Sequence, residues 1–174
     1  MSRLIQCSVL SWVILCSCVP VWADDAEDQS VAFVEKLGGT VTRDEKAPGR
    51  PVITVNLGFK QVTDEGLKEL AGFKNLTGLN LTFTAVTDEG VKELARLTSL
   101  TALSLSVPKV TDAGLKELAP LTNLTSLSLN STKVTDAGLK ELAGLTNLTS
   151  LHVGRAISRR RPSRQTMSLL RRSN

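Results

Sequence analysis

A 24-residue repeat is the feature of this sequence that most limits how the chain can fold. Four units, covering residues 62–85, 86–109, 110–133 and 134–157, each begin with Val-Thr-Asp, and the last two match at 17 of their first 18 positions. Because one unit of this size cannot bury its own apolar side, such units must stack on their neighbours. The sequence therefore predicts an array of stacked units.

The second half of each unit predicts a short β-strand. Leu79 and Leu81 alternate with smaller or polar residues, so both leucines lie on one face of an extended segment. The equivalent leucines are Leu103 and Leu105 in the second unit and Leu127 and Leu129 in the third. We expect these strands to pair in parallel, one from each unit.

The first half of each unit predicts a short helix. In residues 63–70, Thr63 can cap the N-terminus, acidic residues occupy the first turn, and Leu67 and Leu70 face inward. An aspartate and a lysine four residues apart, such as Asp64 and Lys68, recur in every unit. We interpret these charges as surface pairs on a solvated outer face, each contributing a few tenths of a kcal/mol.

The apolar spacing carries a family resemblance. The first unit follows the pattern L-x-x-L-x-L-x-x-N/C-x-L with Leu76, Leu79, Leu81, Thr84 and Val86. Over residues 52–154 the chain resembles leucine-rich-repeat proteins. The VTDxGLKELA motif is most similar to repeats of exported bacterial, planctomycete-like members, and more distantly to the cysteine-containing repeats of F-box adaptors of ubiquitin ligases.

The resemblance implies an α/β fold: a right-handed leucine-rich-repeat solenoid shaped as a horseshoe arc, with short parallel strands on its concave face and short helices on its convex face. The family's Asn or Cys position holds Thr84 and Thr132 but also Lys60, Pro108 and Ala156. Since Pro108 offers no side-chain donor, we expect an altered loop in the second unit. Val107 beside it is then either an exposed feature or neutral drift.

The first 23 residues have the pattern of a secretory signal peptide, with Arg3 before an apolar run and a small-residue cleavage site at Ala23. All three cysteines lie in this segment, so the processed chain has no thiol. Two alternatives stay open, an uncleaved membrane anchor and acylation of Cys18 as in a lipoprotein. We expect a secreted, periplasmic or cell-envelope protein.

Both ends of the array differ from the repeat. Residues 24–61 predict an N-terminal cap, with a helix that starts at Ser30 and ends at the glycines 38–39, followed by a hairpin turning near residues 47–49. After Val153 the repeat pattern stops, and residues 155–174 form an Arg-rich tail that we expect to be disordered. The tail is either a basic arm or the end of an interrupted array.

Composition excludes several classes of function. The formal net charge of +4 arises from seven arginines in the tail, whereas residues 24–154 carry a net charge of −4. A folded nucleic-acid-binding face is therefore not expected. His152 is the only histidine, and no second His, Cys or paired carboxylate accompanies it outside the repeat pattern. We expect neither an enzyme nor a cofactor or metal site.

The remaining candidate site is the outward side of the strands. Repeat proteins commonly bind partners on their concave sheet. The candidate residues are Asn80, Thr82, Ser104, Ser106, Ser128, Asn130 and His152. We expect an exported, monomeric protein-binding module; the alternatives are an intracellular adaptor resembling F-box leucine-rich-repeat proteins, or a truncated structural fragment.

Overall fold

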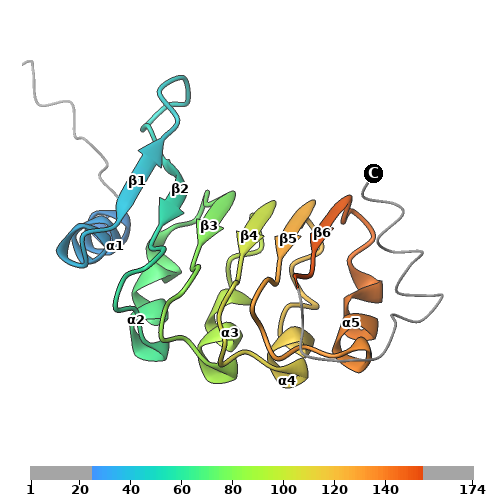
Figure 1. Cartoon of the computed structure of the whole chain (residues 1–174). Helices are drawn as coiled ribbons and strands as arrows, with labels where there is room; N and C mark the ends of the chain where they lie inside the picture. Colours follow the sequence, from blue (N-terminus) through green and yellow to red (C-terminus); the bar gives the residue numbers. More distant parts are fainter. Residues whose placement is uncertain (1–24, 155–174) are drawn as a thin grey trace, which may run out of the picture.

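Each repeat contributes one strand and one helical segment to a curved array (Figure 1). The computed structural model describes residues 25–154. Its strands are β1 (Thr40–Arg43), β2 (Val52–Asn56), β3 (Gly78–Asn80), β4 (Ala102–Ser104), β5 (Ser126–Ser128) and β6 (Ser150–His152). Its α-helices are α1 (Asp25–Lys36), α2 (Asp64–Lys68), α3 (Asp88–Leu94), α4 (Asp112–Lys116) and α5 (Asp136–Glu141). The 3-10 helices η1 (Glu69–Gly72) and η2 (Leu142–Gly144) extend α2 and α5.

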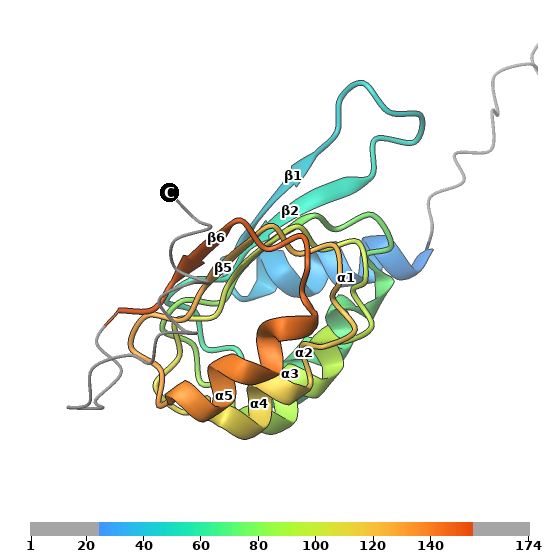
Figure 2. The ribbon, with the colours of Figure 1, turned by 90° about the vertical axis from the view of Figure 1, so that its right-hand side faces the viewer.

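The strands form one sheet in the order β1 to β6. Strands β2 to β6 are parallel, and their register places Leu79, Leu103, Leu127 and Leu151 side by side. Helices α2 to α5 line the opposite side of the arc, as Figures 1 and 2 show. The expected α/β solenoid, with parallel strands on one face and short helices on the other, is confirmed.

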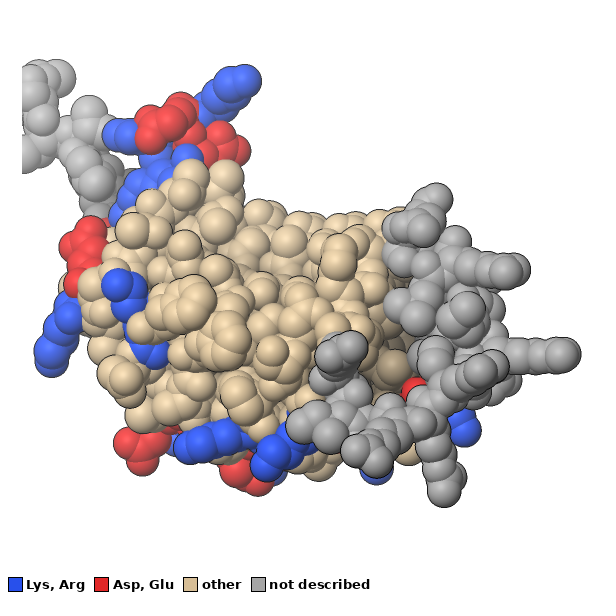
Figure 3. Space-filling view, in the orientation of Figure 1, with Lys and Arg blue, Asp and Glu red and all other residues tan. Residues whose placement is uncertain are grey.

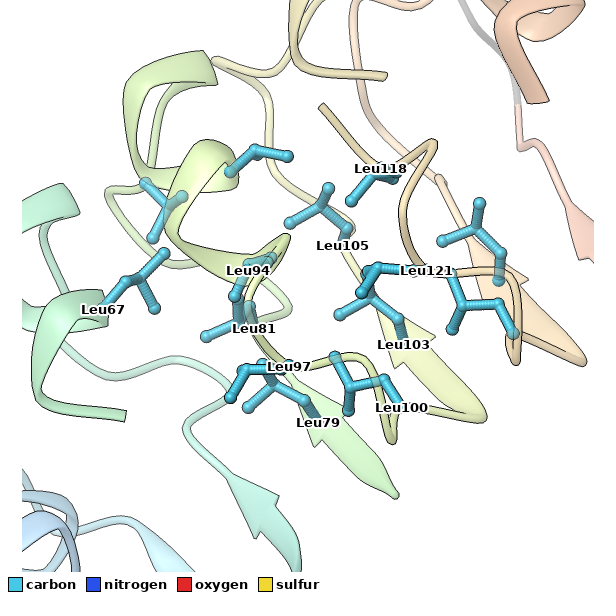
Figure 4. Close-up of a cluster of buried hydrophobic side chains, with 14 of the residues drawn as sticks. Leu67, Leu79, Leu81, Leu94, Leu97, Leu100, Leu103, Leu105, Leu118 and Leu121 are labelled. Carbon is cyan, nitrogen blue, oxygen red and sulfur yellow. The ribbon is translucent and has the colours of Figure 1, made fainter. Parts of the chain in front are cut away.

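The core is a set of leucine and valine columns between the two layers. The strand leucines Leu79, Leu103 and Leu127 are buried, as are helix leucines such as Leu94 and Leu115. Figure 4 shows the labelled leucines filling the space between strands and helices. Every unit therefore buries its apolar side against neighbouring units.

Helix α1 and the β1–β2 hairpin lie at the first end of the sheet (Figure 1). The helix starts at Asp25, five residues earlier than expected. Ser30 does not begin it; its hydroxyl is buried and donates to the carbonyl oxygens of Ala26 and Glu69. Glu27 joins helix and hairpin, because its carboxylate accepts from Arg43 at 2.9 Å and from the backbone N–H of Val52 at 3.2 Å.

Several predictions concern residues outside the described range. These are the signal segment with its cleavage site at Ala23, acylation of Cys18, and the Arg-rich tail at 155–174. Between residues 25 and 154, the structure has no helix with the length and apolar character that crossing a membrane requires.

The Thr-Asp-x-Gly motif joins each repeat to the next. Thr111 donates two hydrogen bonds to Asp88 of the preceding repeat, from its backbone N–H to Oδ1 at 2.8 Å and from its hydroxyl to Oδ2 at 2.6 Å. The same pair of bonds links Thr87 to Asp64 and Thr135 to Asp112. We call this arrangement the aspartate clasp. The sequence analysis interpreted these carboxylates as partners of lysines. In the structure they accept hydrogen bonds from threonines of the next repeat.

The clasp also explains the glycine of the motif. A Cβ atom placed on Gly114 would lie 2.5 Å from Oδ1 of Asp88. Gly90 and Gly138 stand in the same relation to Asp64 and Asp112. Only a residue without a side chain leaves room for the carboxylate of the preceding repeat. The motif is therefore a structural device for stacking.

The loop of the second repeat differs from the others, as expected from Pro108. The backbone φ angle is positive at the equivalent residues Phe59, Phe83 and Ser131, but not at Val107. Proline disfavours α conformations in the residue before it, so Val107 takes another conformation and its side chain is buried. Of the two interpretations of Val107, the exposed feature is wrong.

Candidate functional site

The sheet register aligns one column of candidate residues on the concave face. Asn80 pairs with Ser104, Ser104 with Ser128, and Ser128 with His152. Beside them run Gly78, Ala102 and Ser126, whose small side chains leave a shallow hollow of about 300 Å³ along the sheet. Asn80, Ser104 and Ser128 line this hollow, and His152 lies beyond it, exposed on the last strand.

The second predicted column lies in the loops that follow the strands. Thr82 and Asn130 are half-buried, whereas Ser106 is only 5% exposed. Ser106 is therefore a poor contact residue, because its hydroxyl faces that of Ser128 at 3.3 Å within the sheet surface. The altered loop at Pro108 follows directly.

Side-chain hydrogen bonds connect the two columns. Asn80 donates to Oδ1 of Asn56 at 3.1 Å, and its own Oδ1 accepts from the hydroxyl of Thr82 at 2.7 Å. Thr82 and Ser104 share a hydrogen bond of 2.8 Å, and Asn130 donates to Ser128 at 3.1 Å. Much of the hydrogen-bonding capacity of this face is thus used within the protein, which holds the side chains in place.

The charge distribution separates this face from the rest of the molecule. Figure 3 shows an uncharged surface over the strands and most of the loops below them, with charges on the hairpin, near α1, at the left edge of the loops and along the helices. On the helical side, a hydrogen bond from Lys92 to Glu89 raises the pKa of Lys92. On the hairpin, a hydrogen bond to Glu45 raises the pKa of Arg50. Both cations stay protonated at neutral pH.

Two exposed aromatic side chains were missed by the sequence reasoning. Phe59 and Phe83 stack with ring centroids 5.3 Å apart and an interplanar angle of 27°, while 74% and 50% of their surfaces remain exposed. They occupy the same position of successive units, 24 residues apart. Comparing that position along the repeat would have revealed the pair.

The described residues present no cluster of metal-ligating side chains. Within residues 25–154, no three His, Cys, Asp or Glu side chains gather in a way that could hold a metal ion. His152 shares a contact of 3.3 Å with the hydroxyl of Ser150 on its own strand. The chemistry of the concave face is that of small neutral hydrogen-bonding groups beside two phenyl rings.

Comparison with known proteins agrees with the repeat geometry. A family model described as Leucine Rich repeat matches residues 74–95 and 121–143. The fold of the array is that of a leucine-rich-repeat solenoid. A search of curated proteins gives no match. The planctomycete-like and F-box resemblances stay predictions.

Solved structures with similar folds include two internalins of Listeria monocytogenes. The internalin inlF superposes with a TM-score of 0.50 and 26% sequence identity, over 77% of this chain and 36% of its own. Internalin C2 superposes with a TM-score of 0.43 and 24% identity, over 78% of this chain and 64% of its own. The solenoid described here thus spans about a third of the length of inlF.

Proposed function

We propose that this solenoid is an exported module that binds a protein partner through its concave face. The observation that carries the proposal is the aligned column of Asn80, Ser104 and Ser128, which borders a hollow on an uncharged surface. Interfaces are depleted of charge at their centres, and a concave sheet is the usual binding surface of repeat proteins. A catalytic role is not part of the proposal, because leucine-rich-repeat folds are generally non-catalytic.

Export rests on the first 23 residues, and the processed N-terminus tests it. We expect mass spectrometry of the chain recovered from its native cells to show a start at Asp24, because the small-residue site at Ala23 precedes two acidic residues. An acylated Cys18 would identify a lipoprotein. A soluble chain that retains Met1 would contradict export and favour the intracellular adaptor.

The concave site makes its own prediction. Replacing Asn80, Ser104 and Ser128 together with lysine should abolish binding to a partner captured from the native envelope, because three adjacent ammonium groups would have to be desolvated without counter-ions. The triple variant should keep the wild-type circular dichroism spectrum, since these side chains lie at the surface. Pull-down with a purified partner measures the effect.

A matched control uses the opposite face. Changing Lys68, Lys92 and Lys116 to serine alters the same number of equivalent repeat positions on the helical side, and binding should survive. Loss of binding only in this control would place the site on the convex face. The adaptor alternative gains no support from residues 25–56, which form the helix and hairpin at the end of the sheet.

A further inference from the structure

We infer that the stacked pair Phe59 and Phe83 anchors the partner, and that the partner presents an uncharged polypeptide segment with an aliphatic or aromatic side chain. This inference rests on the proposed function and names the chemistry of its ligand. Both rings protrude from loops that follow neighbouring strands, β2 and β3, and most of Phe59 is in contact with solvent. Exposed apolar clusters beside a neutral surface are typical of interaction sites.

The loops hold the two rings firmly. The backbone N–H of Phe59 donates to the carbonyl oxygen of Thr82 at 2.8 Å, and that of Phe83 to the carbonyl oxygen of Ser106 at 3.0 Å. Each loop is thus tied to the next repeat, and the rings stack on each other. A ligand meets a platform that is already ordered, which lowers the entropic cost of binding.

The fold does not require phenylalanine at these positions. The backbone φ angles of Phe59 and Phe83 are 61° and 54°, in the left-handed region that bulky residues disfavour. Ser131 occupies the equivalent position of a later repeat with a φ of 60°. A small polar residue therefore supports the same loop, and the rings are available for a role outside the fold.

The pair is continuous with the concave hollow. A Cβ atom placed on Gly58, the residue before Phe59, would lie 3.1 Å from Nδ2 of Asn80. Asn80 itself lines the hollow. In Figure 3 the uncharged surface covers the strands and most of the loops below them, with Lys or Arg at its left edge. One extended segment can therefore lie along the hollow and place a side chain against the rings.

The surroundings of the rings favour a neutral peptide. The residues that line the hollow are uncharged, so a charged segment lying along it would lose hydration without meeting an opposite charge; Lys60, which follows Phe59, is not among them. A glycan would need several free hydrogen-bonding groups, but Asn80, Thr82 and Ser104 bond to one another. An apolar side chain gains from burying the exposed rings and needs few new hydrogen bonds.

The test is a selection of random 12-residue peptides, displayed on phage, against the full chain. Enriched peptides should lack charged residues around a central Leu, Ile, Phe or Trp, and synthetic copies should bind in fluorescence anisotropy. The double variant Phe59→Ser with Phe83→Ser should weaken binding at least tenfold at an unchanged melting temperature. Adding Ser131→Phe to that variant restores one exposed ring elsewhere and should not restore binding.

The remaining outcomes separate this inference from the proposed function. If lysine at Asn80, Ser104 and Ser128 abolishes peptide binding but serine at Phe59 and Phe83 does not, the concave site stands and the aromatic anchor is wrong. If only the serine variant at the two phenylalanines loses peptide binding, the anchor stands and the hollow is not involved. Three outcomes would overturn the inference. The selection enriches no peptide, the enriched peptides carry charged residues around their centre, or the chain binds the neutral oligosaccharide maltohexaose in place of peptides.

Discussion

Replacing Leu127 with aspartate is expected to lower the free energy of unfolding by about 4 kcal/mol or more. Leu127 is fully buried on β5, between β4 and β6, in register with Leu103 and Leu151. A carboxylate there has no partner of opposite charge, and the lost leucine leaves a void between two repeats. Urea unfolding followed by circular dichroism measures the change.

The neighbouring residue supplies the control. Ser128→Asp introduces the same carboxylate one position further along β5, on the concave face, where Ser128 is half-buried and borders the hollow. Its effect should stay within about 1 kcal/mol, because the carboxylate reaches water. Equal unfolding midpoints for the two variants would show that the strand faces are assigned wrongly.

Period and alternation were enough to predict stacked units with paired strands, and the family resemblance implied the solenoid. The alternation of Leu79 and Leu81 with polar residues defines which side of each strand is buried, and the 24-residue period then aligns the columns. The concave column of Asn80, Ser104 and Ser128 followed from the same two facts. A site built from repeated positions is readable because the sheet register repeats with the sequence.

Contacts between successive repeats were harder to predict. Asp88 and Lys92 are four residues apart on one helix, so the sequence suggested a surface pair, but Asp88 binds Thr111 on the next turn of the solenoid. That partner is 23 residues away, and its position depends on how the turns stack. The repeat position shared by Phe59 and Phe83 is readable from the sequence, but their stacking depends on loop conformations with positive φ angles. No local pattern predicts such angles for phenylalanine.

The clasp leads to a prediction that runs against helix propensity. Glycine to alanine inside a helix usually stabilises it, by about 0.5–1 kcal/mol. Gly114→Ala should instead destabilise the solenoid by about 1–3 kcal/mol, because its Cβ would meet Oδ1 of Asp88 at 2.5 Å and loosen the bonds to Thr111. Gly144→Ala is the matched control. Its Cβ would meet no atom within 4 Å, so this variant should be neutral or slightly stabilising.

A double-mutant cycle then assigns the cost to the carboxylate. Asp88→Ala removes the atom that the new methyl group would strike, at the cost of the two hydrogen bonds from Thr111. In the Asp88→Ala background, Gly114→Ala should therefore lose most of its penalty, giving a coupling of about 1 kcal/mol or more between the two sites. Chemical unfolding of the four proteins measures it. Additive effects would mean that Gly114 is required for another reason, such as its contact with Val110, whose Cγ1 would lie 3.2 Å from the same Cβ.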